Sequence, residues 1–412
     1  MSLRIDTSDA GRLTDLVSLG ALTSLIPREV LDGAIEAHGR REERVRKLPS
    51  HLVVYLLVAL CLFPDDDYEQ VAEKLAGLLS GVPGAHWPPP SRGAITQARK
   101  RLGPEVVREL FGRLARPAAT SATAGAWLER WRLMALDGFV LDLPDTDANV
   151  AEFGKEQVGG DGAAFPQARV VAISECASHA VVAADLAGRG TGEQALARSL
   201  YRQLGADMLL TADRRFYSFD AWRQARRSGA QLLWRVQAGL QPTHLRDLPD
   251  GSWLGVVAGP DLGQPSRDRL AAAARAGRPL DEDRAVVVRV VEYRVPDRRG
   301  ADLRLLTSIL DPSAAGAEKL AQAYHGRWEA EAGADRLRTQ LRGPGRILRS
   351  RTPDLAHQEI WAYLLTHWAV ATLVCTTATA VGLDPDRAKA CADLRIVRRP
   401  VADRPTSQPS RS

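Results

Sequence analysis

The chain has 412 residues, of which 45% are hydrophobic and 25% charged, so it is long enough for about two to four folding units with ample apolar core. These proportions exclude a mostly disordered chain. The four cysteines lack CxxC or zinc-site spacing, which excludes a disulfide scaffold and indicates a reducing compartment. The net charge of +5 is only mildly basic and is weak evidence for a nucleic-acid partner.

No segment has the features of a membrane span or a secretion signal. The apolar runs at 51–63 and 361–374 are shorter than the roughly 20 residues that a span needs. The N-terminal residues lack the apolar stretch of a signal peptide. We therefore expect a cytoplasmic protein with no membrane partner.

Residues from about 10 to 125 are predicted to be helical, because apolar residues recur there at helical spacing. A proline-rich loop at 83–91 interrupts the pattern, and two further helices follow it. The first of these carries Arg92 and Arg99. Their side chains either lie along DNA phosphates or belong to an ordinary solvated helix face.

From Trp131 the pattern changes to strands that alternate with helices, which predicts an α/β core. Strands are expected at 131–145, 168–175, 179–188 and 207–213, and helices at 192–205 and 219–229. A β-rich insertion is expected over 230–311, with a charged, alanine-rich loop at 267–279. A long helix at 315–341 and an apolar helix at 358–374 follow, and the tail from 397 is predicted to be disordered.

Three acidic residues are candidates for chemistry. Asp137 lies where a strand meets a glycine, Asp213 ends a short buried strand, and Glu331 lies within the long predicted helix. Strand ends are where α/β sheets place functional side chains. Each residue also has an ordinary interpretation: a hairpin turn for Asp137, a helix cap for Asp213, and a solvated charge for Glu331.

The long helix favours the functional interpretation through its geometry. At 3.6 residues per turn, Tyr324, Arg327, Glu331 and Arg338 fall on one face, within roughly 60° of one another. Glu329 lies on nearly the opposite face. A carboxylate between two arginines is well suited to hold a divalent cation while the arginines bind phosphate oxygens.

These segments resemble the bacterial DDE transposases of the insertion-element-four family. The C-terminal signature of that family is Tyr-x2-Arg-x3-Glu-x6-Lys, and this chain has Tyr324, Arg327, Glu331 and Arg338 at the four fixed positions. The blocks LDGFVLDLPDTDANVAEFG and LLTADRRFYSFDAW are similar to the two aspartate blocks of the family, and the N-terminal helices to its separate N-terminal domain. The likeness extends over residues from about 10 to 375 in the family's order.

The resemblance implies an α/β, ribonuclease-H-like catalytic core in which Asp137, Asp213 and Glu331 hold two Mg²⁺ ions, for which Mn²⁺ can substitute. Two such ions activate the attacking oxygen and stabilise the leaving oxygen. It also implies DNA contacts by Tyr324 and Arg327. The first predicted domain is a helical N-terminal DNA-binding domain at 1–125. The catalytic core follows in two parts, at 126–229 and 312–376, with a β-rich insertion at 230–311 between them. A C-terminal tail occupies 377–412.

The expected function is cut-and-paste DNA transposition at the nucleoid. The protein would bind terminal inverted repeats as a dimer on paired DNA ends, cleave there and join the ends to target DNA. The insertion would help hold the element's end, where Trp234 or Trp253 either stacks on an unpaired base or is a core residue.

Two alternatives are a two-metal nuclease without strand transfer and a decayed copy that only binds DNA. Three positions, Phe139, Gly333 and Arg338, depart from the family pattern. Gly333 and Arg338 argue mildly for a decayed copy, whereas the three intact acidic residues argue against it.

Overall fold

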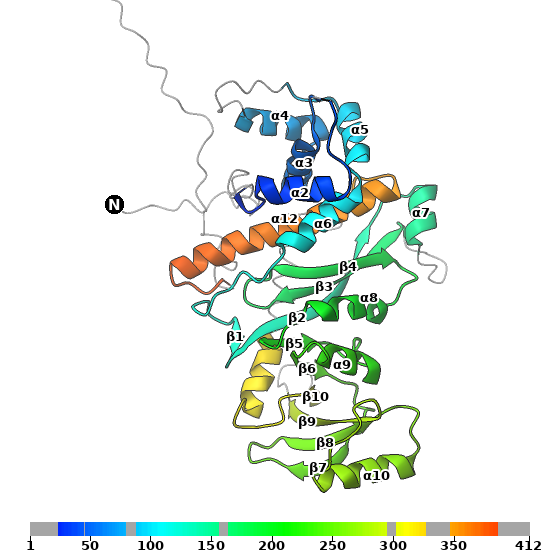
Figure 1. The fold of residues 1–412 in the computed structure, drawn as a ribbon, viewed down its shortest axis with the longest axis vertical. Helices are drawn as coiled ribbons and strands as arrows, with labels where there is room; N and C mark the ends of the chain where they lie inside the picture. Colours follow the sequence, from blue (N-terminus) through cyan, green and yellow to red (C-terminus); the bar gives the residue numbers. More distant parts are fainter. Residues whose placement is uncertain are drawn as a thin grey trace, which may run out of the picture.

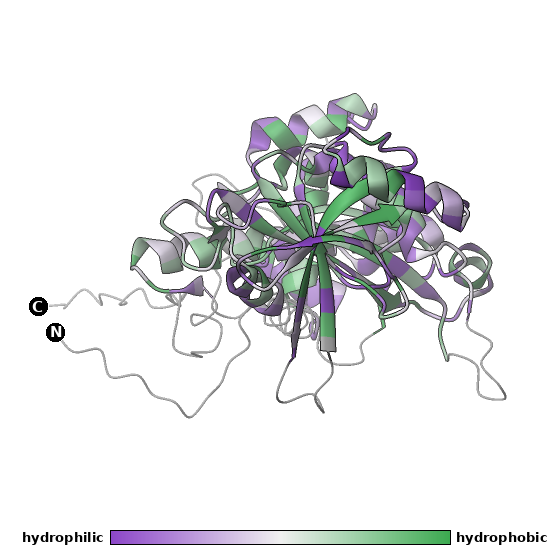
Figure 2. Cartoon of the chain, turned by 90° about the horizontal axis from the view of Figure 1, so that it is seen from below, coloured by the Kyte–Doolittle hydropathy of each residue, from purple (hydrophilic) through white to green (hydrophobic). Residues whose placement is uncertain are grey.

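One twisted sheet runs through the molecule, from a helical region at one end to a β-rich extension at the other (Figure 1). The structure is a computed structural model that describes residues 24–44, 46–79, 88–155, 164–294, 302–326 and 347–385. When the molecule is viewed along its long axis, the mostly apolar strands fan out around the line of sight, and helices of mixed polarity lie outside them (Figure 2). This arrangement is the usual result of strand twist accumulating across a large sheet.

The helical region contains α2 (Arg28–Ala37), α3 (Ser50–Leu62), α4 (Tyr68–Leu79), α5 (Arg92–Leu102) and α6 (Pro104–Leu114). The predicted helices are therefore confirmed in the described part of this region. Helix α3 is apolar on nearly every side, as expected for a helix in the middle of a core. Helix α5 begins where the side chain of Ser91 accepts the N–H of Ala94, and it ends at Gly103, whose φ of 75° favours glycine.

Helix α12 (Pro353–Ala380) joins the helical region to the sheet. It runs diagonally between them (Figure 1), and its apolar residues share one buried cluster with residues of α2, α3, α5 and α6 and with strand residues such as Leu141 and Val170. Its 28 residues are long and apolar enough to cross a membrane, yet 78% of its most apolar window is buried in the protein. The helix is therefore the central element of a core that both regions share.

The middle of the sheet has the α/β arrangement that the sequence predicts. Strands β2 (Trp131–Asp142), β3 (Gln167–Glu175) and β4 (Val181–Gly188) pair antiparallel. Strands β5 (Met208–Ala212) and β6 (Gln231–Arg235) then continue the sheet parallel to β2. The helices that connect these strands are α7 (Asp147–Phe153), α8 (Glu193–Leu200) and α9 (Phe219–Arg226), and the short strand β1 (Trp127–Leu128) pairs with β2.

The β-rich extension is continuous with this core sheet. It contains β7 (Thr243–Asp247), β8 (Trp253–Ala258), α10 (Gln264–Arg275), β9 (Ala285–Arg294) and β10 (Asp302–Thr307). Strand β10 pairs with β6, which gives the order β4-β3-β2-β5-β6-β10-β9-β8-β7. The predicted insertion boundary at 230 is corrected, because β6 pairs with β5 and belongs to the core ladder.

The predicted loop at 267–279 is also wrong, since most of it forms α10. The only buried residue of this helix is Ala271, so it lacks the apolar stripe by which a helix is usually identified. Its alanines and arginines have high helix propensity, which is enough to form a helix on the surface.

Candidate active site

Asp137 and Asp213 lie at matching positions on neighbouring parallel strands. Strands β2 and β5 pair in register with Leu136 opposite Ala212, and each aspartate is the next residue of its chain segment. Strands are about 4.8 Å apart, and residues opposite each other point to the same face. The ladder therefore brings together two carboxylates that are far apart in the sequence.

Asp137 lies between two apolar clusters that cover the same face of the sheet. On one side, Ala135 packs with Tyr324 from helical residues 317–326. On the other side, Leu141 belongs to the cluster around α12. The opposite face is closed by a third cluster that includes Leu136 and residues of α8 and α9. Asp137 is half-buried, at the interval between the first two clusters.

The structure excludes the ordinary interpretations of both aspartates. Asp137 is not in a hairpin turn, because β2 and β3 remain paired without interruption from Met134 to Asp142. Asp213 is not a helix cap, because α9 begins six residues later and Ser218 caps it by accepting the N–H of Ala221.

Asp213 has a cation beside it that the sequence did not single out. The Nη1 atom of Arg235, at the end of β6, lies 3.7 Å from Oδ1 of Asp213. That distance is longer than a hydrogen bond, and Oδ1 is buried with no hydrogen-bond partner among the described residues. The only sequence signal for Arg235 is its place at the end of a strand, which has meaning only once β6 is known to neighbour β5.

The two aspartates fit part of a metal site. The buried Oδ1 of Asp213 accepts no hydrogen bond from the described residues and so is available to a cation, and hard oxygen ligands suit Mg²⁺. Within the described ranges, no three His, Cys, Asp or Glu side chains are close enough to hold a metal ion. The predicted third ligand, Glu331, lies outside those ranges, as do Arg327, Arg338 and Gly333.

The prediction that Tyr324 contacts DNA is wrong for this structure, because its side chain is fully buried. It packs in the cluster that holds residues 317–326 against β2 and β5. The ring therefore anchors the helix, at a point close to Asp137 along β2.

The prediction that Arg99 contacts DNA is also wrong. Its side chain is only 2% exposed and binds the segment around the start of α12. Nε donates to Gln358 at 2.9 Å, Nη1 to the Tyr68 hydroxyl at 2.7 Å, and Nη2 to Ser350 at 2.9 Å and the carbonyl of Leu355 at 3.0 Å. Arg99 thus fastens the helical region to α12.

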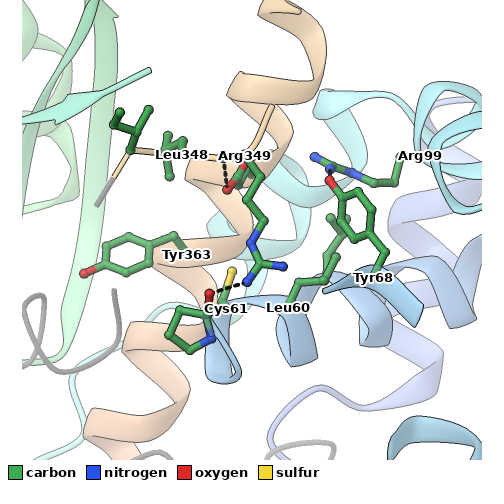
Figure 3. A pocket seen from close by; sticks show the side chains of 11 residues that line it. Leu60, Cys61, Tyr68, Arg99, Leu348, Arg349 and Tyr363 are labelled. Atoms are coloured by element: carbon green, nitrogen blue, oxygen red, sulfur yellow. Dashed lines mark hydrogen bonds between the residues drawn. The ribbon is translucent and has the colours of Figure 1, made fainter. Parts of the chain in front are cut away.

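A pocket at this junction shows how the two regions are joined (Figure 3). Arg99 and Tyr68 meet on one side of it. On the other side, Arg349 donates to the carbonyls of Asp66 at 2.7 Å and Pro64 at 2.6 Å. Burial raises the pKa of the Cys61 thiol in this pocket to about 12, so the thiol stays protonated at neutral pH.

Replacing Arg99 by methionine should lower the free energy of unfolding by about 3 kcal/mol, because it leaves several buried acceptors without a donor. Urea unfolding of the full chain would measure this. Arg92→Met is the matched control, since Arg92 is exposed on the same helix and its loss should cost about 0.5 kcal/mol or less. Equal effects of the two changes, or a loss of DNA binding by Arg99→Met with unchanged stability, would contradict the anchoring role.

The other candidate DNA contacts divide by exposure. Arg92 is exposed, with its guanidinium 5.8 Å from the centre of the Tyr68 ring. Trp234 is fully buried between Tyr201 and Trp222, so it is a core residue and does not stack on a base. Trp253 is partly exposed, and its indole N–H donates to Glu292 at 3.2 Å.

Comparisons with known proteins agree with this architecture. Residues 16–112 match the family model for the N-terminal region of insertion element 4 transposases, and residues 132–369 match the model for the transposase DDE domain. Transposase InsG for insertion sequence element IS4, from Escherichia coli K12, is 28% identical over 371 residues, which cover 87% of this chain and 78% of that protein.

A solved structure, the piggyBac transposase synaptic complex with hairpin DNA, aligns with 92% of this chain and 79% of that chain, with a TM-score of 0.47 and 10% identity. The DDE model alone spans more than half of the chain, and the N-terminal model covers most of the helical region. The chain therefore belongs to the insertion-element-four family of DDE transposases.

Proposed function

We propose that this transposase moves its element by a cut-and-paste reaction, in which it binds the terminal inverted repeats, cleaves the DNA at both ends and joins them to a target. The observation that carries the proposal is the pair of half-buried carboxylates, Asp137 and Asp213, at matching positions of β2 and β5. Phosphodiester cleavage by hard metal ions needs such a pair on a rigid support.

We propose that Asp137, Asp213 and Glu331 hold two Mg²⁺ ions, with Mn²⁺ as a substitute. When bound, such ions lower the barrier at the attacking and the leaving oxygen. The described residues that flank Glu331 support its inclusion. Tyr324 packs beside the beginning of β2, whereas the N–H of Leu348 donates to the carbonyl of Asp142 at the end of β2. The two ends of the intervening segment thus lie on either side of Asp137.

The chain's own groups have separate roles in this proposal. The carboxylates of Asp137 and Asp213 supply negative charge at fixed positions on the sheet. Arg235 supplies positive charge 3.7 Å from Asp213, where it can pair with a phosphate oxygen of the bound strand. Tyr324 holds the preceding part of the glutamate-bearing segment against the sheet.

For DNA binding we propose two surfaces, the exposed side of α5 and the β-rich extension, where Trp253 is the remaining candidate for base stacking. Two copies of the protein would act on paired DNA ends. The proposed domains are the N-terminal helical domain, the two-part catalytic core, the β-rich extension and the C-terminal tail, with β6 assigned to the catalytic core.

The proposal is tested with purified protein and a DNA duplex that ends in the element's terminal repeat. Cleavage should require Mg²⁺ or Mn²⁺ and cease with EDTA, and joined products should form with a target plasmid. Cleavage without joining would favour the nuclease alternative. Binding without cleavage in either metal would favour a decayed copy.

Arg92→Ala should weaken DNA binding by a similar factor on specific and unrelated sequences, because phosphate contacts carry no base information. The slope of log affinity against log salt should fall by about one. Fluorescence anisotropy of the full chain at several salt concentrations would measure both. Arg113→Ala is the control, because that arginine is paired with Glu109 at 2.8 Å on α6. An unchanged slope for Arg92→Ala would place the phosphate contacts elsewhere.

A further inference from the structure

A partly buried ion pair in the β-rich extension binds the beginning of the helix formed by residues 317–326. Arg289 of β9 is fully buried and pairs with Asp250, in the turn between β7 and β8. Its Nε donates to the Ser252 hydroxyl at 2.7 Å, and its Nη1 donates to the carbonyl of Ala315 at 2.7 Å. The planar guanidinium thus connects β9 and the turn between β7 and β8 to the residues that lead into the helix.

Asp250 caps that helix although it lies 67 residues earlier in the chain. Its Oδ2 accepts the N–H of Ala317, the first helical residue, at 2.8 Å. A carboxylate at this position satisfies an otherwise unpaired N–H and is favoured by the helix dipole. Although burial acts to raise it, the pKa of Asp250 is lowered, because Ser252 and Ala317 donate hydrogen bonds and Arg289 is positively charged. The cap is therefore ionised at neutral pH.

The other end of the described helix is held by the core. Tyr324 lies seven residues after Ala317, about 10 Å along the axis, and is buried against the strands that carry the aspartates. Lys319, in the first turn, also pairs with Glu129 at 2.6 Å, beside β2. The helix is thus fixed at its first turn by the extension and by Glu129, and further along, at Leu320 and Tyr324, by the catalytic sheet.

We infer that Arg289 and Asp250 are positioning residues, which set the place and rotation of the helix leading to Glu331 and so connect the extension to the metal site. The inference rests on the proposed function for its catalytic consequence. A carboxylate ligand must be placed accurately, and a displacement of about 1 Å can cost about 100-fold in rate.

The test is Arg289→Met, with Arg304→Met as the matched control. Arg304 also belongs to an ion pair of the extension, with Glu292 at 2.7 Å, but among the described residues its side chain donates hydrogen bonds to Glu292 and to the carbonyl of Leu240 and not to the helix. Amide hydrogen exchange of residues 317–326 in metal-free protein should become at least fivefold faster in Arg289→Met and stay unchanged in Arg304→Met. The cleavage rate at saturating DNA should fall at least tenfold in Arg289→Met relative to the wild type, while its DNA affinity in EDTA changes less than twofold.

Equal exchange in the two variants, or faster exchange with an unchanged cleavage rate, would overturn the inference. If Arg289→Met does not fold, Asp250→Asn answers the same question, because it removes the charge of the cap and keeps its size. If the wild-type protein cleaves in neither metal, the proposed function fails. Hydrogen exchange then still decides whether the extension holds the helix.

Discussion

Replacing Asp137 or Asp213 by asparagine should lower the rate of terminal-repeat cleavage by about three orders of magnitude, equivalent to about 4 kcal/mol of transition-state stabilisation. The amide keeps the shape of the carboxylate and loses the charge that holds a metal ion. Because neither residue lies on the proposed DNA-binding surfaces, affinity for the same DNA in EDTA should stay within twofold. Single-turnover cleavage and fluorescence anisotropy would measure the two quantities.

Asp185→Asn is the matched control for this pair. Asp185 is a half-buried aspartate on β4 of the same sheet, and its carboxylate accepts a hydrogen bond from Ser199 of α8 at 2.6 Å. It lies opposite Val171, which faces the cluster on the other side of the sheet. Its replacement should leave cleavage unchanged. Full activity of Asp137→Asn or Asp213→Asn in Mg²⁺ would refute the assignment of the active site.

Glu331→Gln should also reduce cleavage by orders of magnitude, whereas Glu329→Gln should cost only a few-fold. On the predicted helix at 315–341, a step of about 100° per residue turns Glu331 to within about 20° of Tyr324 and Glu329 to about 140° from it. Tyr324 is buried against the strands that carry Asp137 and Asp213, so the face of the helix that bears Tyr324 is the face toward the aspartates.

The outcomes of this comparison are distinct. Equal losses from Glu329→Gln and Glu331→Gln would mean that both carboxylates have an essential partner. Loss from Glu329→Gln alone would show that the helical register is wrong, and the proposed roles of Arg327 and Arg338 would fail with it. Cleavage in Mn²⁺ as well as Mg²⁺ should be measured for each variant, because a weakened site can still bind the ion at higher concentration.

Local sequence patterns were sufficient to predict the alternating strands and helices of the core. They also placed Asp213 directly after a short strand, whereas Asp137 lies within β2 and not at its end. They could not predict the surroundings of Arg99, because its partner Gln358 is 259 residues away and only tertiary packing brings the two together. Arg235 was missed for a similar reason, since its proximity to Asp213 depends on the pairing of β5 with β6. Helix α10 was missed because a surface helix with one buried residue has almost no apolar periodicity.

The core shared through α12 has a consequence for how the protein is made. The N-terminal helices leave the ribosome first, but the helix that completes their apolar core begins at Pro353, some 240 residues after α6 ends at Leu114. At about 5–20 residues per second, translation takes roughly 10–50 s to cover that distance. During this time the early helices lack their partner, and a chain that stops short of α12 cannot complete the helical core. A prematurely terminated chain therefore lacks the helix against which the apolar faces of α3, α5 and α6 pack.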